Sequence, residues 1–150
     1  MKGQIAERPV EILVVDDNPG DLRLTAEALK EGKVQNRLHL ARDGVEAIAF
    51  LRRKGNYIDA PRPDLILLDL NMPRMNGREL LAEIKDDSEL KHIPVVILTG
   101  SREMDDIVKT YDLRANCYVT KPIDLEQYIT MVKSITDFWL TTLQLPMEES

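Results

Sequence analysis

The chain has 150 residues, the usual size of one domain and enough to bury a core without disulfides. A hydrophobic content of 43% is ordinary for a globular protein, and a net charge of −6 argues against binding to nucleic acid. The single cysteine, Cys117, excludes an internal disulfide and a cysteine metal cage. The sequence shows no membrane-length apolar run and no signal-peptide core, so we expect a cytoplasmic protein that binds no membrane.

Five short apolar runs predict β-strands. Three of them are nearly continuous apolar blocks, which is typical of strands that are covered on both faces of a parallel sheet. The runs are Ile12–Val15, Leu38–Leu40, Leu65–Leu68, Val95–Leu98 and Cys117–Val119.

Apolar residues at helical spacing follow each of these runs. The stripes are Leu22, Ala26 and Leu29; Val45, Ile48, Ala49 and Leu51; Leu80, Leu81 and Ile84; Met104, Ile107, Val108 and Tyr111; and Leu125, Tyr128, Ile129, Val132, Ile135 and Trp139. This alternation predicts an α/β fold with five helices and a doubly wound five-stranded parallel sheet, order 2-1-3-4-5, of the flavodoxin-like type. We interpret residues 1–150 as a single domain with its core at about 10–140, in which Lys54–Asp64 forms a surface loop.

Polar residues follow four of the predicted strands. They are Asp16 and Asp17 after the first, Asp69 and Asn71 after the third, Thr99 after the fourth, and Lys121 after the fifth. Because ligands bind beyond the carboxyl ends of the strands in such sheets, we expect these side chains to converge on one rim.

Each of these residues has an ordinary structural explanation when it is taken alone. Asp16 or Asp17 could cap a helix that begins at Pro19, Thr99 could be another cap, and Lys121 could be a solvated surface charge. Three acids packed together without a counter-ion would repel one another, however, so the set predicts a divalent cation. Oxygen donors alone favour Mg²⁺, and a hydroxyl with an ammonium opposite the metal suits a phosphoryl group.

Other chemistries lack their motifs. The sequence contains no phosphate-binding P-loop and no glycine-rich dinucleotide fingerprint after the first predicted strand. Ser101 lies in no nucleophile elbow. We interpret His39 as a strand surface residue and His92 as a loop residue, too few for a metal triad.

The ordered set of motifs resembles the receiver domain of two-component response regulators, over about Val10–Trp139. The residues that carry this resemblance are Asp16-Asp17, Asp69 with Met72–Gly77 (MPRMNG), Thr99, and Lys121-Pro122. The wording DLNMPRMNG, the Lys54–Asp64 loop and the extended final helix look most like the small cyanobacterial phytochrome-partner regulators. The resemblance implies a stand-alone response regulator in a phosphorelay, which catalyses only its own phosphorylation and dephosphorylation.

The resemblance also implies a role for each site residue. Asp69 would accept a phosphoryl group from the phosphohistidine of a sensor histidine kinase, of the phytochrome type. Asp17, Asp69 and the backbone carbonyl of Asn71 would bind Mg²⁺ directly, and Asp16 through a water molecule. The resemblance further implies that Lys121 and Thr99 contact the phosphoryl group and that Tyr118 changes rotamer. It also implies a cis peptide bond between Lys121 and Pro122.

Two alternatives remain open at this point. An aspartate-nucleophile phosphatase of the haloacid dehalogenase type also uses Asp, Mg²⁺, Thr and Lys, but it needs a second Asp where this chain has Asn71. A pseudo-receiver that works without phosphorylation would lack a site residue, and none is missing here.

The final apolar stripe predicts a homodimer. A helix over Leu125–Leu143 would be about 28 Å long, whereas a five-residue strand is about 17 Å long, so its last turns should overhang the sheet. Large apolar residues in that overhang, Phe138 and Trp139 among them, need a cover. The alternative cover is the N-terminal segment, through Ile5 and Val10.

Overall fold

The computed structural model describes residues 9–30, 35–69, 77–99, 117–120 and 124–134, with residues 77, 78, 99 and 117–120 described by their backbone alone. Its centre is one parallel sheet in the order β2-β1-β3-β4-β5. The strands are β1 (Val10–Val15), β2 (Asn36–Ala41), β3 (Leu65–Asp69), β4 (Val95–Thr99) and β5 (Cys117–Thr120). The strand order predicted from the sequence is confirmed.

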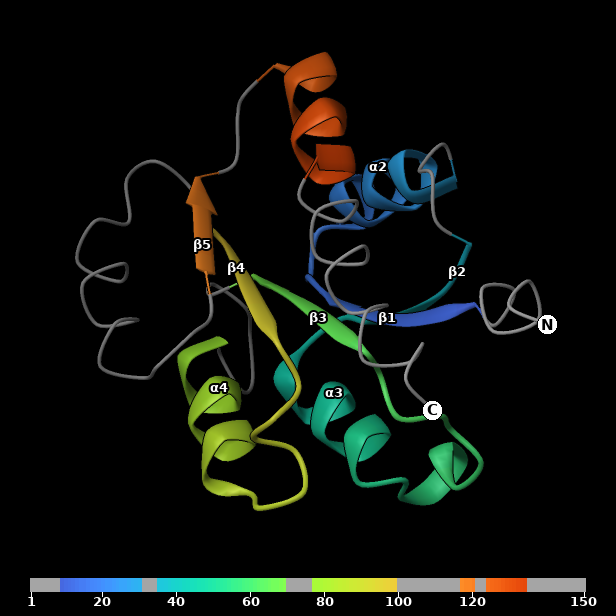
Figure 1. Ribbon diagram of the computed structural model, residues 1–150, viewed down its shortest axis with the longest axis vertical. Helices are drawn as coiled ribbons and strands as arrows, with labels where there is room; N and C mark the ends of the chain where they lie inside the picture. The colour runs from blue at the N-terminus through green and yellow to red at the C-terminus, as the bar shows by residue number, and fades with distance from the viewer. Residues whose placement is uncertain (1–8, 31–34, 70–76, 100–116, 121–123, 135–150) are drawn as a thin grey trace, which may run out of the picture.

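Helices cover both faces of this sheet (Figure 1). One face carries α2 (Pro19–Lys30) and a helix over residues 125–134, drawn in orange to red in Figure 1. The other face carries α3 (Gly44–Leu51), the short helix η1 (Gly55–Tyr57) and α4 (Gly77–Asp86). The helix expected around Met104–Tyr111 lies outside the described residues, as do Ile135, Phe138 and Trp139.

Two apolar cores, one on each face, hold these layers together. β1 and β3 contribute to both cores because every residue of both strands is buried, alternate side chains pointing to opposite faces. On the α3 and α4 side the core includes Leu13, Val15, Ala47, Phe50, Ile66, Leu68, Leu80, Leu81, Ile84 and Ile97. On the α2 side it includes Ile12, Val14, Leu22, Ala28, Leu29, Leu65, Leu67, Tyr128 and Val132.

The buried faces of three helices differ in part from the predicted stripes. In α2 the buried set is Leu22, Thr25, Ala28 and Leu29, so Ala26 was wrongly placed at its centre. Val45 of α3 and Leu125 of the last helix are exposed, at 42% and 55%. Both residues lie in the first turn of their helices, where helical spacing alone does not distinguish a buried position from an exposed one.

The end of α3 is a Schellman turn in which an arginine occupies the left-handed position. The N–H of Arg53 donates to the carbonyl of Phe50 (3.2 Å), and the N–H of Lys54 donates to that of Ala49 (2.9 Å). Arg53 has a φ of 56°. Glycine is the usual residue there because it has no Cβ to crowd the backbone.

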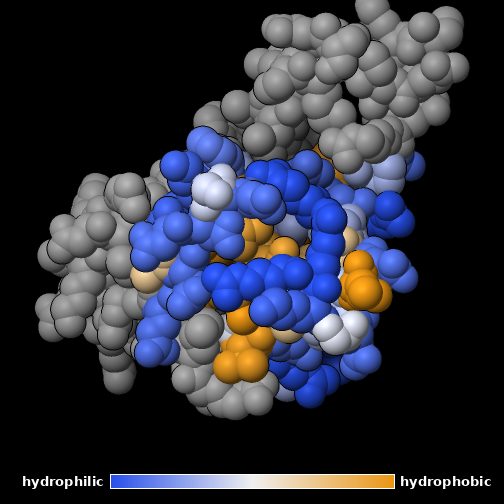
Figure 2. Space-filling view, turned by 90° about the horizontal axis from the view of Figure 1, so that it is seen from below, coloured by the Kyte–Doolittle hydropathy of each residue, from blue (hydrophilic) through white to orange (hydrophobic). Residues whose placement is uncertain are grey.

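The described surface on the α3 and α4 side is mainly hydrophilic, with separate apolar patches (Figure 2). The large apolar side chains exposed in the described part of the chain are Leu40, Val45, Ile58 and Leu125. In that same part, every helix is too short or too polar to cross a membrane.

Candidate functional site

Strand register places the residues singled out in the sequence along one rim of the sheet. Val15 of β1 lies beside Leu68 of β3, so Asp16 comes level with Asp69. Asp69 in turn lies beside Leu98 of β4, one residue before Thr99. Since parallel strands end at the same edge, four strands deliver their last residues to this rim.

Three carboxylates meet at that rim. Asp16, Asp17 and Asp69 each bring a carboxylate oxygen to a point where all three oxygens lie within 4.8 Å of one another. Asp16 and Asp69 are buried, at 2% and 9% exposure, whereas Asp17 is exposed. The sequence prediction that these acids converge is therefore correct for all three.

The turn between β1 and α2 fixes the orientation of Asp16. The Asp16 carboxylate accepts a hydrogen bond from the backbone N–H of Asn18 (2.9 Å). The side-chain oxygen of Asn18 then accepts from the N–H groups of Gly20 (2.8 Å) and Asp21 (3.1 Å), in the first turn of α2. Asn18 thus fills the capping role that the sequence would also have allowed for Asp16 or Asp17, directly before a proline at the first helical position.

The donor set fits a hard divalent cation. Carboxylate oxygens are the ligands that Mg²⁺, Mn²⁺ and Ca²⁺ prefer, and each cation would relieve the mutual repulsion of the three charges. Asp69 is the last residue of β3 and Asp16 directly follows β1, so the two strands place both carboxylates at the rim.

The remaining predicted site residues lie outside the described part of the chain, wholly or in their side chains. Asn71, Lys121 and Pro122 fall in residues that the structure does not describe. Thr99 and Tyr118 are placed by their backbones, at the end of β4 and within β5. Their side-chain roles stay predictions.

Comparison with known proteins decides the family. Residues 12–133 match the response regulator receiver domain. The chain belongs to the family of response regulator receiver domains. As a receiver-domain response regulator, the protein is a component of two-component signalling rather than a conventional enzyme.

Individual receivers are similar over almost the whole chain. The response regulator Rcp1 of Synechocystis sp. is 49% identical over 92% of this chain and 94% of its own. A crystal structure of the phosphorylated cyanobacterial phytochrome response regulator RcpA is 52% identical, with a TM-score of 0.86 over 90% of this chain and 96% of that one. A structure of the Mn²⁺-bound form of Rcp1 has a TM-score of 0.83 over 88% of this chain and 95% of that one.

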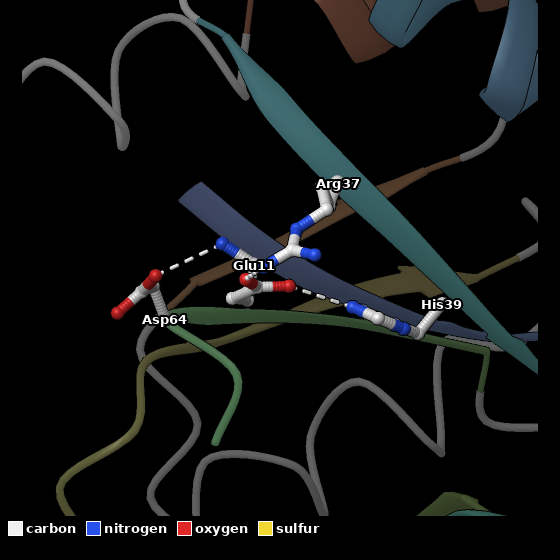
Figure 3. Close-up of polar contacts among 4 residues, drawn as sticks. All are labelled: Glu11, Arg37, His39 and Asp64. Carbon is white, nitrogen blue, oxygen red and sulfur yellow. Dashed lines mark hydrogen bonds and ion pairs between the residues drawn. The ribbon is translucent and has the colours of Figure 1, made fainter. Parts of the chain in front are cut away.

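A second charged cluster lies at the opposite end of β1 in this receiver (Figure 3). The Glu11 side chain is 7% exposed, and its two oxygens bind Arg37 Nη2 (2.8 Å) and His39 Nε2 (2.7 Å) of β2. The backbone of Glu11 is held as well, because its N–H donates to the Asp64 carboxylate (2.9 Å) and its carbonyl accepts from the Asp64 N–H (2.7 Å). His39, expected to be a surface residue, is therefore a partly buried partner of the Glu11 carboxylate.

Proposed function

We propose that Asp69 is the phosphoacceptor of this response regulator. The observation that carries the proposal is the buried Asp69 carboxylate in a cluster with Asp16 and Asp17 at the carboxyl end of the sheet. An Asp69 oxygen would form a bond to phosphorus while the phosphorus–nitrogen bond of a phosphohistidine breaks, and the leaving imidazole would keep the electron pair. The protein's part is positioning and charge compensation, since transfer of a phosphoryl group needs little covalent help.

We propose Mg²⁺ as the resident cation of the acidic cluster. Asp17, Asp69 and the backbone carbonyl of Asn71 would bind it directly, and Asp16 would bind through a water molecule. A bound cation would offset the negative charge on the phosphoryl oxygens. The Mn²⁺-bound form of the relative Rcp1 supports a divalent cation in general, and the abundance of oxygen donors supports Mg²⁺.

The other rim residues would act on the phosphoryl group itself. Lys121 would pair with Asp69 and then with a phosphoryl oxygen, Thr99 would donate a hydrogen bond to it, and Tyr118 would change rotamer as Thr99 moves. The Lys121–Pro122 bond is proposed to be cis, since X–Pro is where that isomer costs least. Phosphorylation adds about two negative charges, which would draw Thr99 and Lys121 inward and pass the signal to the neighbouring surface.

The proposed phosphodonor is a sensor histidine kinase of the phytochrome type. The likeness to Rcp1 and to the phytochrome response regulator RcpA supports this partner. A histidine kinase that takes its phosphoryl group from ATP does so in the cytoplasm, so we place the protein there. We propose no nucleic-acid or membrane partner. We further infer a single receiver domain across residues 1–150. A helix over the apolar stripe Met104–Tyr111, between β4 and β5, would bring the number of α-helices to five.

We also propose a homodimer through the end of the last helix. Phe138 and Trp139 supply the apolar side chains of the interface, as the length of the helical stripe predicts. Sedimentation of the wild type and of Trp139→Glu, with and without a phosphoryl mimic, tests this. A wild type that stays monomeric at tens of micromolar in both states would rule the dimer out.

The phosphoacceptor is tested by mass spectrometry after incubation with Mg²⁺ and acetyl phosphate. The wild type should gain one base-labile phosphoryl group, and Asp69→Asn should gain none because an amide is not a nucleophile. Asp59→Asn, at an exposed aspartate of the surface loop, is the matched control and should label normally.

The same assay separates the alternatives. Sustained release of phosphate from a phosphomonoester would indicate an aspartate-nucleophile phosphatase. A wild type that stays unlabelled would indicate a pseudo-receiver, and full labelling of Asp69→Asn would move the phosphoacceptor elsewhere.

A further inference from the structure

A buried hydrogen bond joins the first and last described helices. The hydroxyl oxygen of Tyr128 lies 2.9 Å from Oγ1 of Thr25 in α2. Both residues are buried, Thr25 at 0% and Tyr128 at 3% exposure, inside an otherwise apolar core. Figure 1 shows the two helices side by side on one face of the sheet. A polar pair in such a place is costly unless each group is satisfied, so its position must be well defined.

The donors and acceptors of this pair can be assigned. The Thr25 hydroxyl donates to the backbone carbonyl of Asp21, one turn earlier in α2 (2.9 Å). A threonine hydroxyl has one hydrogen, so Thr25 must accept from Tyr128. The two hydrogen bonds of Thr25 therefore connect the last helix to the first turn of α2.

The same first turn leads to the acidic cluster. The N–H of Asp21 donates to the side-chain oxygen of Asn18 (3.1 Å), and the N–H of Asn18 donates to the Asp16 carboxylate (2.9 Å). Asp16 shares the cluster with Asp17 and Asp69. A continuous series of short contacts thus runs from Tyr128 through Thr25, Asp21 and Asn18 to Asp16.

We propose that Tyr128 and Thr25 are positioning residues for the divalent-cation site. They set the place of the α2 first turn, and through Asn18 they set the orientation of the Asp16 carboxylate. The inference rests on the proposed function of the acidic cluster and adds a link to the last helix. The link is reciprocal, since a helix that favours cation binding must itself be stabilised when the cation binds.

The first experiment measures Mg²⁺ affinity by titration of the backbone amide signals of Asp16–Asn18 in NMR spectra. Tyr128→Phe and Thr25→Val should each weaken Mg²⁺ binding by about threefold, a size typical of residues that modulate a site without contacting its ligand. Thr25→Ser keeps the acceptor oxygen and should bind Mg²⁺ like the wild type. Wild-type affinity in Thr25→Val or Tyr128→Phe would overturn the proposal.

A matched control separates positioning from loss of packing. Val132→Ala removes apolar volume one turn away from Tyr128, in the same core, and leaves every side chain of the hydrogen-bonded series unchanged. It should lower the unfolding temperature at least as much as Tyr128→Phe, yet leave Mg²⁺ affinity unchanged. Equal losses of Mg²⁺ affinity in the two variants would reduce Tyr128 to a structural residue.

A double-mutant cycle tests the route through Asp16. In an Asp16→Ala background, Tyr128→Phe should have no further effect on Mg²⁺ affinity, because the carboxylate that it positions is gone. A threefold effect that persists there would refute the route. A wild type that binds no Mg²⁺ would instead refute the proposed metal site, so the two failures are distinguishable.

Hydrogen exchange measures the effect of Mg²⁺ binding on the last helix. Mg²⁺ should slow amide exchange in residues 125–134 of the wild type and not in Thr25→Val. Equal protection by Mg²⁺ in both proteins would contradict the proposed link.

Discussion

The two ends of β1 each bury a carboxylate, but in opposite electrostatic surroundings. At the start of the strand, the Glu11 carboxylate is buried between two basic side chains, Arg37 and His39. At its end, the Asp16 carboxylate is buried beside two further acids, Asp17 and Asp69. Both carboxylates are buried. The first lies against basic side chains of β2, and the second lies against two other carboxylates.

The Glu11 carboxylate has partners that stabilise the fold, whereas the acidic cluster is the proposed site of a bound cation. A buried charge is tolerated when the protein supplies its counter-charge, as β2 does for Glu11. Acids gathered together repel one another, and a bound cation lowers that repulsion. Mutation of Glu11 should therefore lower stability without changing cation binding. Mutation in the acidic cluster should weaken cation binding and raise the stability of the metal-free protein.

Cation binding should show the largest contrast. Asp17→Ala should weaken Mg²⁺ binding by about 100-fold and Asp16→Ala by about tenfold, because loss of a direct ligand costs more than loss of a water-mediated one. Glu11→Gln should leave Mg²⁺ affinity unchanged. An NMR titration measures all three, and equal effects of the two aspartate substitutions would mean that the direct and water-mediated roles are wrongly assigned.

Stability should respond at the other end. Glu11→Gln should lower the free energy of unfolding by about 2 kcal/mol, because it removes the partner of two basic groups in a largely buried place. The exposure of Arg37, at 64%, keeps the loss below that of a fully buried pair.

Chemical denaturation measures this loss, with Glu83→Gln as control. Glu83 binds Arg52 at 2.9 Å on the surface, and its loss should cost no more than about 0.5 kcal/mol. Similar losses in the two variants would mean that the Glu11 pair is no stronger than a surface pair.

Relief of repulsion should follow at the acidic end. In the absence of divalent cations, Asp16→Asn should raise the free energy of unfolding by about 1 kcal/mol, the Coulomb energy of two charges about 4 Å apart in water. The amide keeps an oxygen for the Asn18 N–H, so the turn is preserved. Denaturation in EDTA measures the gain, which saturating Mg²⁺ should cancel or reverse. A metal-free protein destabilised by Asp16→Asn would show that the cluster stores no repulsion.

The smallest effect concerns Tyr57 at alkaline pH. Burial, and then the nearby carboxylates of Glu46 and Asp43, raise the pKa of Tyr57, whose ring packs edge-on against Phe50. The folded protein then holds the Tyr57 proton more tightly than the unfolded chain does. This contribution to stability is complete below about pH 10, the ordinary tyrosine pKa, and is lost as pH rises through the raised value.

Denaturation of wild type and Tyr57→Phe between about pH 9 and pH 11 measures that contribution. The wild type should lose more stability than Tyr57→Phe over this range. Parallel pH profiles would show that the Tyr57 environment does not distinguish the two states of the phenol.

The sequence predicts the sheet well because buried parallel strands have a simple signature. Leu65–Leu68 and Val95–Leu98 are apolar blocks that lie within β3 and β4. The edge strand β2 is longer than its apolar part, Leu38–Leu40, since Asn36 and Arg37 pair with β1 through backbone atoms that any residue has. The acids of the candidate site were predictable because strand order brings their positions together.

The polar contacts inside the fold could not be predicted in the same way. Thr25 is a polar residue on a buried helix face, and its partner Tyr128 lies 103 residues further along the chain. Glu11 likewise depends on Arg37 and His39, 26 and 28 residues away. Such pairs follow from three-dimensional packing, and no local period or motif in one sequence signals them.

The left-handed arginine at the end of α3 offers a handle for protein engineering. Arg53 adopts a φ of 56°, a conformation that costs an L-residue about 1 kcal/mol and glycine almost nothing. The position lies beyond the helix, away from the acidic rim, so its residue type is open to choice. An Arg53→Gly variant would have a slightly higher free energy of unfolding. It could therefore tolerate destabilising substitutions at the rim during directed evolution of the switch.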